Sequence, residues 1–179
     1  MHDDQQRTVR LQVEVEDCGI VYLADEEFSK DVESPAQSAA IIEAKTSCVT
    51  LHITHQWGSA EFTVTVADRD PGADREGYED IVEVAYVSGS GRLVLAGFSF
   101  DEHVMHPLPA LPAGPAAYRV RYHVKGMDME GTDEYPDDHY LQIWPAPIAD
   151  PVVVKATTRP FEYFLDPERF IRSLGESAR

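Results

Sequence analysis

The chain has 179 residues, 43% of them apolar, and its 32 acidic residues outnumber its 15 lysines and arginines, giving a formal net charge of -17. This length suits one domain, residues 1–179, with a sizeable core. The charge disfavours binding to nucleic acid or to an anionic membrane, because both require a basic surface. A strongly acidic surface instead favours a basic protein as partner, or serves only to keep the protein soluble.

The N-terminal residues, Met1 to Gln6, lack the basic and apolar regions of a signal peptide. No apolar run approaches the roughly 18 residues of a membrane span, so the sequence predicts a cytoplasmic protein. Cys18 and Cys48 are the only cysteines, and each lies in an apolar, strand-like context. This context favours two buried free thiols, with a single disulfide as the alternative.

Alternation of apolar and polar residues predicts that most of the chain is β-strand. In the N-terminal half it predicts strands at residues 9–15, 20–23, 49–53 and 62–66. Residues 39–44 fit either a short helix or a strand. The Gly-Ser turn at 58–59 predicts that the strands on either side of it pair as a hairpin.

A second hairpin is predicted from residues 79–87 and 92–98, which flank a Ser-Gly-Ser-Gly turn. Residues 101–115 are rich in proline and are expected to form an extended crossing segment. Residues 152–154 are predicted to form the last strand. The Asp166-Pro167-Glu168 sequence then predicts a short helix at 167–174 within a C-terminal tail, residues 159–179.

The segment from Leu111 to Pro147 contains the clearest strand pair. Its first strand, Tyr118 to Lys125, alternates apolar residues with four basic ones, which predicts an apolar face in the core and a basic face in water. The basic residues are Arg119, Arg121, His123 and Lys125. Its second strand, Tyr140 to Trp144, ends at Pro145 because proline cannot donate to a ladder.

These short strands, with turns between them and no alternating helices, predict an antiparallel two-sheet β-sandwich with a short C-terminal helix. A partly open β-barrel is the alternative.

An acidic loop separates the two strands of this pair. Its acidic residues are the candidate partner-binding residues of the chain: Asp128, Glu130, Asp133, Glu134, Asp137 and Asp138. Such a cluster fits a contact with a basic protein, a metal site, or a fold-back of the loop over the neighbouring basic face.

Metal and catalytic motifs give no stronger candidate. His52/His55 and His103/His106 have H-x-x-H spacing, but residues i and i+3 of a strand face opposite ways, and no third ligand is spaced to join either pair. The aspartates between Asp68 and Asp74 resemble the start of a calcium loop, although Asp-Pro-Gly is equally good turn chemistry.

No nucleophile elbow, phosphate loop or dinucleotide fingerprint is present, so the sequence predicts no cofactor and favours a non-enzymatic protein. A metal-assisted hydrolase built on the aspartate loops is the enzymatic alternative.

Four aromatic residues suggest an alternative binding role. They are Trp57, Trp144, Tyr118 and Tyr122. Together they would line a groove for a small ligand or carbohydrate, although aromatic residues at strand spacing are more often part of a core.

Three segments carry a resemblance to a known family: Val82–Val87, the Leu-Pro-Ala-Gly-Pro sequence leading into Tyr118–Arg121, and Tyr140–Pro147. Between residues 40 and 158 they resemble a family of small uncharacterised bacterial proteins, distantly similar to competence protein J, a nuclease inhibitor. The resemblance implies a non-enzymatic β-sandwich that blocks a nuclease or toxin with acidic side chains. We therefore expect an acidic binding protein, either an inhibitor or an immunity protein of a basic nuclease or toxin.

Overall fold

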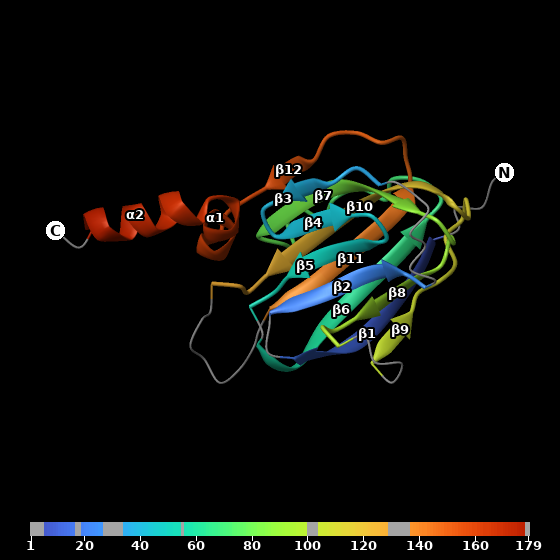
Figure 1. Ribbon diagram of the computed structural model, residues 1–179, viewed down its shortest axis with the longest axis horizontal. Helices are drawn as coiled ribbons and strands as arrows, with labels where there is room; N and C mark the ends of the chain where they lie inside the picture. The colour runs from blue at the N-terminus through green and yellow to red at the C-terminus, as the bar shows by residue number, and fades with distance from the viewer. Residues whose placement is uncertain are drawn as a thin grey trace.

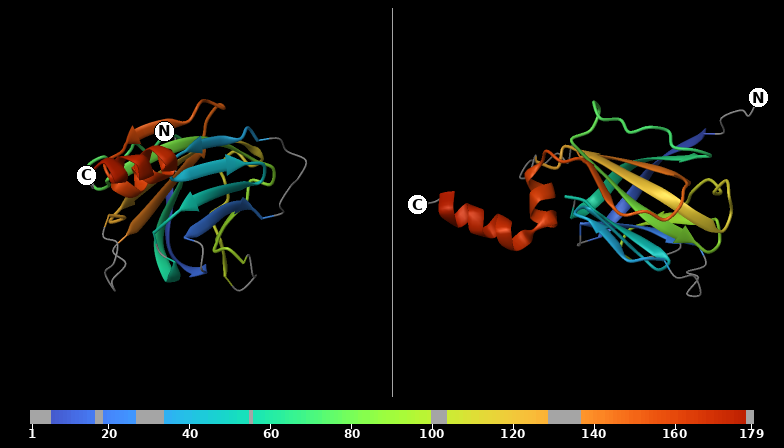
Figure 2. Two further views of the ribbon diagram at one scale, coloured as in Figure 1. Left: turned by 60° about the vertical axis from the view of Figure 1, so that its left-hand side comes forward. Right: turned by 90° about the horizontal axis from the view of Figure 1, so that it is seen from above.

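The computed structural model describes residues 6–16, 19–26, 34–54, 56–99, 104–128 and 137–177. Their strands form two six-stranded sheets stacked face to face (Figures 1 and 2). Sheet A contains, in spatial order, β1 (Gln6–Glu16), β6 (Trp57–Ala67), β11 (Asp138–Pro145), β10 (Ala116–Lys125), β7 (Asp80–Ser88) and β12 (Val152–Lys155). Sheet B contains β3 (Gln37–Ala39), β4 (Ile42–Lys45), β5 (Cys48–His52), β2 (Ile20–Asp25), β8 (Leu93–Ala96) and β9 (Met105–Pro107).

This arrangement confirms the predicted two-sheet sandwich and excludes the partly open barrel for the described strands. Neighbouring strands are antiparallel throughout, with one exception: β11 and β6 are parallel, with His139 opposite Phe62. The ambiguous segment 39–44 is the tight β3–β4 hairpin, in which Ala40 adopts a positive φ of 53°.

Both hairpins predicted from the turn sequences are wrong, because β5 and β6 lie in different sheets, as do β7 and β8. Alternation specifies which face of a strand is buried but not which strand pairs with it. The Ser-Gly-Ser-Gly turn instead leads from sheet A to sheet B around the buried carboxylate of Asp25 on β2. This carboxylate accepts hydrogen bonds from the hydroxyl of Tyr86 (2.8 Å) and the N–H groups of Gly89 (3.2 Å) and Ser90 (2.8 Å).

The apolar face of β10 lies in the core, as its alternation predicts. Tyr118 and Tyr122 are fully buried there, in one continuous core with residues of both sheets. Each phenol is hydrogen-bonded: Tyr118 donates to the carbonyl of Gly114 (2.7 Å) and Tyr122 to that of His52 (3.1 Å). A buried tyrosine therefore stabilises the fold through its ring without leaving an unsatisfied hydroxyl.

The opposite face of β10 was expected in water, and that expectation is wrong for three of its four basic residues. Arg119 and Arg121 are each 5% exposed and His123 is fully buried. Backbone atoms of the chain cover them: the guanidinium of Arg119 donates to the carbonyls of Ala149 (3.2 Å) and Asp150 (2.9 Å). The outer face of sheet A thus carries a second, polar layer beneath the loops, and the sequence gives no sign of these covering segments.

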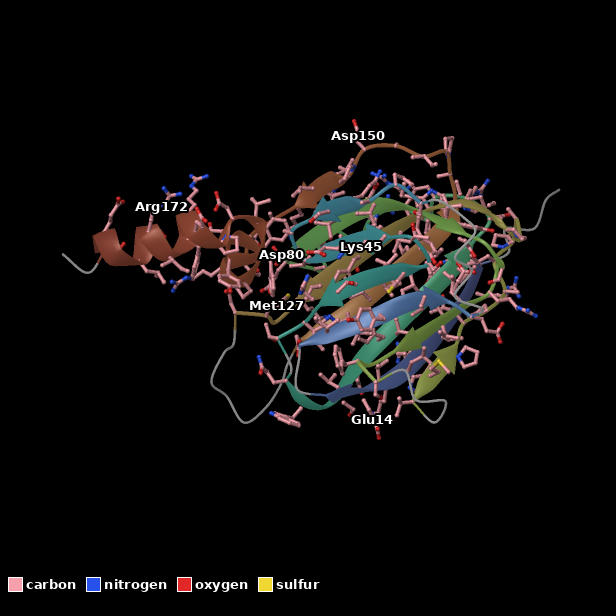
Figure 3. All side chains as sticks on the ribbon, in the orientation of Figure 1. Glu14, Lys45, Asp80, Met127, Asp150 and Arg172 are labelled. Carbon is pink, nitrogen blue, oxygen red and sulfur yellow. The ribbon has the colours of Figure 1, made fainter. Side chains whose placement is uncertain are left out.

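Two helices, α1 (Arg159–Leu165) and α2 (Pro167–Ser177), follow the last strand. The second confirms the predicted helix, while the first was missed. The body holds α1 through Phe161, which is buried, and through Asp80, which accepts hydrogen bonds from the N–H and hydroxyl of the capping residue Thr158. No residue of α2 is buried, and this helix extends away from the sandwich (Figures 1 and 2). Figure 3 shows Asp80 at the base of α1 and Arg172 out along α2.

Cys48 is a free thiol, and burial raises its pKa to about 11. Cys18 lies outside the described residues. Among those residues, no helix combines the length and apolar character needed to cross a membrane.

Candidate functional site

The outer face of sheet A is covered over β10 and β7 and over the adjoining residues Thr65 of β6 and Gln142 and Trp144 of β11, which are buried. It is open over β1 and over the ends of β6 and β11 that carry Glu61 and Asp138. On this open half lies a groove of about 600 Å³. The charged residues and tyrosines that line it are Arg10, Glu61, Asp74, Tyr78, Asp138 and Tyr140. We call this site the tyrosine groove.

Strand register brings the floor of the groove together. Arg10 of β1 lies opposite Thr63 of β6, which in turn lies opposite Tyr140 of β11. Because neighbours Phe62 and Leu141 point into the core, this row faces outward. Residues separated by up to 130 positions in the sequence therefore form one continuous surface.

The floor tyrosine is held rigidly by hydrogen bonds at its hydroxyl. Tyr140 donates to the hydroxyl of Thr65 (3.1 Å) and accepts from the side-chain amide of Gln142 (3.1 Å). Gln142 also donates to the carbonyl of Gly72 (2.8 Å), which links the floor to the covering loop. The ring of His123 stacks on Tyr140 at 4.9 Å between centroids. The aromatic surface is therefore fixed in position.

Tyr78, from the loop before β7, forms the wall. Its ring centroid lies 5.9 Å from that of Tyr140 and 5.2 Å from that of His123. Burial, followed by the nearby carboxylates of Asp138 and Asp74, raises the pKa of the Tyr78 phenol well above its ordinary value. The groove thus presents this residue as an uncharged aromatic ring.

Asp74 is fixed beside this wall through its backbone and its side chain. Its N–H donates to Nε2 of His123 (3.2 Å), and its carboxylate accepts from the N–H of Gly77 (2.9 Å). A Cβ atom at Gly77 would lie 2.4 Å from a carboxylate oxygen of Asp74, so a side chain there would displace this carboxylate. The carboxylate is consequently preorganised.

Carboxylates dominate the charge of the groove. Glu61, Asp74 and Asp138 face a single lining cation, Arg10. At the rim, the ammonium of Lys125 lies 3.3 Å from Asp138 and 5.3 Å from the centre of the Tyr78 ring. Chemically, this combination of carboxylates and aromatic rings suits a cationic group.

The acidic residues proposed from the sequence occupy different environments. Asp138 is partly exposed and lines the groove. Asp137 is buried, where it accepts from the hydroxyl of Thr54 (3.0 Å) and lies 3.1 Å from Nε2 of His139. Asp128 is exposed, accepts from the N–H of Arg159 (3.0 Å), and lines a separate pocket of about 480 Å³ between the helices and the sandwich. Glu130, Asp133 and Glu134 lie outside the described residues.

The idea that the acidic loop neutralises the basic face holds among the described residues only at Lys125, which pairs with Asp138. Arg119 and Arg121 instead share the carboxylate of Glu83, at 3.0 and 2.7 Å. The chain thus uses a carboxylate of the neighbouring strand β7 for the buried guanidinium groups.

The resemblance to a calcium loop has another explanation. The two carboxylate oxygens of Asp70 accept hydrogen bonds from Arg121 at 2.8 and 3.1 Å, and one also accepts from the N–H of Gly72 (2.8 Å). This is a turn anchored to the sheet. Within the described ranges, no three histidine, cysteine, aspartate or glutamate side chains converge as metal ligands would. His55 and His103, one member of each H-x-x-H pair, lie outside those ranges.

The aromatic groove expected from the sequence does not form. Tyr118 and Tyr122 are core residues, and Trp57 is 60% exposed. Trp144 lies on the outer face of the sheet, where the guanidinium of Arg121 covers its ring at 4.5 Å. The aromatic residues that do line a groove, Tyr78 and Tyr140, were not singled out. Alternation places Tyr140 on a strand, but only the parallel β6–β11 register shows which residues accompany it.

Neither a protein-family model nor a curated protein sequence matches the chain. The chain is, however, structurally similar to ComJ from Bacillus subtilis, an inhibitor of the DNA-degrading activity of NucA. The match has a TM-score of 0.52 and 10% identity, and it covers 80% of this chain and 99% of ComJ. A protein described as crocagin biosynthetic gene J matches with a TM-score of 0.49 and 17% identity over 81% of this chain and 99% of its own. The chain therefore bears a distant resemblance to competence protein J, at the level of the fold.

Proposed function

We propose that this protein is a non-enzymatic binding protein that inhibits a basic nuclease or toxin. The observation that carries the proposal is the structural likeness to a nuclease inhibitor, which extends over 99% of that inhibitor's chain. The described part of the present chain thus has the framework on which such an inhibitor is built.

The charge of the chain supports a basic partner. A net charge of -17 accelerates encounter with a positively charged protein and disfavours direct competition for its nucleic acid substrate. Steering of this kind acts mainly on the association rate and weakens as salt is added. The acidic residues Asp128, Glu130, Asp133 and Glu134 belong to this steering surface in our proposal.

The tyrosine groove is the contact site that we propose within this surface. It combines a rigid aromatic floor, which favours affinity at protein interfaces, with carboxylates at its edges, which give specificity for a basic partner. Asp138 belongs to this contact. Asp137, which the sequence grouped with it, has its carboxylate turned inward to Thr54 and His139 and is left out of the interface.

The experiment is capture followed by inhibition. The full-length protein is immobilised and exposed to an extract of its host at about 0.05 M and about 0.5 M salt. A captured basic nuclease or toxin is then purified and titrated with the protein while its activity is measured. We expect inhibition to be complete near one equivalent at low salt and weaker at high salt.

Two outcomes would contradict the proposal. The first is capture only of proteins that are not basic or that retain full activity in excess inhibitor. The second is protection through the nucleic acid, seen as a shift of DNA by the protein alone in a gel. The gel assay is therefore run without nuclease as the control.

A further inference from the structure

We infer that the tyrosine groove receives an arginine side chain of the basic partner, with its guanidinium over a tyrosine ring and hydrogen-bonded to the carboxylates of Asp74 and Asp138. The inference rests on the proposed function, which supplies a basic protein as the source of the arginine. It adds the chemical group that is recognised and the residues that recognise it.

The covered half of the same sheet face already binds a guanidinium in this way. Arg121 lies over the ring of Trp144 at 4.5 Å and donates to both carboxylate oxygens of Asp70 at 2.8 and 3.1 Å. An aromatic face with a bidentate carboxylate is the arrangement that suits a planar guanidinium. The chain's own arginine thus shows what this kind of surface accommodates.

The open half carries the same ingredients. Tyr78 and Tyr140 supply the rings, and Asp74 and Asp138 supply the carboxylates, around a groove of about 600 Å³. This volume accommodates a single long side chain entering from a partner. Arginine is favoured over lysine because its flat, weakly hydrated group both stacks on an aromatic ring and donates to two carboxylates at once.

A cation of the protein itself already rests at the rim. The ammonium of Lys125 is 3.3 Å from Asp138 and 5.3 Å from the centre of the Tyr78 ring. Both members of this ion pair are exposed by more than a third, so the pair is weak and easily displaced. Lys125 therefore competes with an incoming arginine.

Rigidity favours binding at this site. The hydroxyl of Tyr140 is fixed by Thr65 and Gln142, and Asp74 is fixed by His123 and Gly77. A preorganised site loses little side-chain freedom when its ligand arrives. The groove is thus distinguished from the remaining acidic surface by geometry as well as charge.

The test uses N-acetyl-L-arginine amide as the probe and N-acetyl-L-citrulline amide, its uncharged counterpart, as the control. Both are titrated into the full-length protein while NMR chemical shifts are recorded. We expect arginine amide, with a dissociation constant on the order of millimolar, to shift the signals of Asp74, Tyr78 and Tyr140. Citrulline amide should leave them unchanged.

Three variants sharpen the result. Lys125→Met removes the cation that competes for Asp138. It should tighten binding about threefold, which corresponds to the strength of one weak ion pair. The Asp74→Asn/Asp138→Asn double variant should weaken it at least about tenfold, on the scale of lost charge-assisted hydrogen bonds. The control is the double variant Glu162→Gln/Glu176→Gln, which changes the net charge by the same amount as the aspartate variant. Both positions are exposed, lie on the helices and are outside the groove lining, so this variant should bind arginine amide like the wild type. Unchanged amide spectra elsewhere confirm that each variant is folded.

Equal effects of the two double variants, shifts spread over the acidic surface, or equal binding of citrulline amide would overturn the inference. These outcomes are separable from failure of the proposed function. If arginine amide binds in the groove and no nuclease is inhibited, the function is wrong and the groove assignment stands. If a nuclease is inhibited and the groove variants inhibit it as well as the wild type, the groove assignment is wrong and the function stands.

Discussion

The backbone N–H of Asp74 donates a hydrogen bond to Nε2 of His123 at 3.2 Å. This contact identifies Nε2 as an acceptor, so the proton of the neutral ring lies on Nδ1, which donates to the carbonyl of Tyr140 (3.2 Å). One histidine therefore joins the groove wall to two strands of sheet A. The hydrogen bond from Asp74 can form only while this ring is neutral, because a protonated Nε2 cannot accept.

This contact makes the fold sensitive to acid. Burial lowers the pKa of His123 from its usual 6.5 to about 4. The unfolded chain takes up a proton near pH 6.5 whereas the folded ring stays neutral to about pH 4, so the free energy of unfolding falls as pH drops between these values. Across this pH range, the titration of His123 lowers the free energy of unfolding by up to about 3 kcal/mol.

Urea unfolding of the wild type and His123→Gln at pH 7 and at about pH 4.5 measures the effect. We expect the stability difference between the two proteins to shrink by about 2 kcal/mol at the lower pH. An equal difference at both pH values would show that His123 does not titrate in this window.

The same substitution should have very different effects on stability at two neighbouring aspartates. Asp137 is buried against Thr54 and His139, whereas Asp138 is partly exposed. Asp137→Asn should therefore destabilise the protein by about 2–3 kcal/mol, the scale of a buried hydrogen bond to a charged group. Asp138→Asn should change stability by less than about 0.5 kcal/mol. Equal effects in urea unfolding would mean that the burial of Asp137 contributes nothing.

Glu83 should be among the most sensitive carboxylates of the fold. It accepts from Arg119 (3.0 Å) and Arg121 (2.7 Å), both nearly buried. Because Glu83→Gln leaves two buried guanidinium groups short of negative charge, we expect a loss of about 3–5 kcal/mol. Glu61→Gln, an exposed position on the same sheet face, is the control and should cost less than about 0.5 kcal/mol. A loss at Glu83 as small as at Glu61 would contradict the buried network.

Asp80 should control the docking of the C-terminal segment. Its carboxylate accepts hydrogen bonds from the N–H groups of Thr157 (2.7 Å) and Thr158 (3.2 Å). In Asp80→Ala, amide hydrogen exchange should accelerate throughout residues 156–177 as α1 detaches. Asp166→Ala, which removes the acceptor for the Arg169 N–H at the start of α2, should accelerate exchange in α2 alone. Identical exchange patterns in the two variants would contradict this assignment.

The sequence predicted most of the strands because alternation depends on local burial. Tyr118 and Tyr122 face the core as the period of two requires, and Tyr140 begins a stretch that is confirmed as β11. Pairing was harder to predict. The turn at Ser88–Gly91 has hairpin chemistry, yet the carboxylate of Asp25, more than 60 residues earlier, directs it from one sheet to the other.

The site was predicted less well than the strands, because it too depends on contacts between residues far apart in the sequence. Loop segments cover Arg119 and Arg121, and their place over the sheet depends on long-range hydrogen bonds that leave no periodic pattern. Of the six acidic residues proposed, Asp138 lines the groove, while its companions Tyr78 and Asp74 come from a loop that the sequence explains equally well as a turn. The parallel register of β6 and β11 forms the floor of the groove, and long-range hydrogen bonds from Asp74 to His123 and from Gln142 to Gly72 hold this loop beside it.

Inhibition of the captured nuclease by charge-matched variants tests the central claim most directly. The inhibition constant is measured for the wild type, Asp74→Asn/Asp138→Asn, and Glu162→Gln/Glu176→Gln at one salt concentration. We expect the groove variant to inhibit about 10–100 times more weakly, on the scale of two lost charge-assisted contacts, and the helix variant to inhibit within about twofold of the wild type. Equal inhibition by all three proteins would contradict the claim that this protein acts on a basic partner through the tyrosine groove.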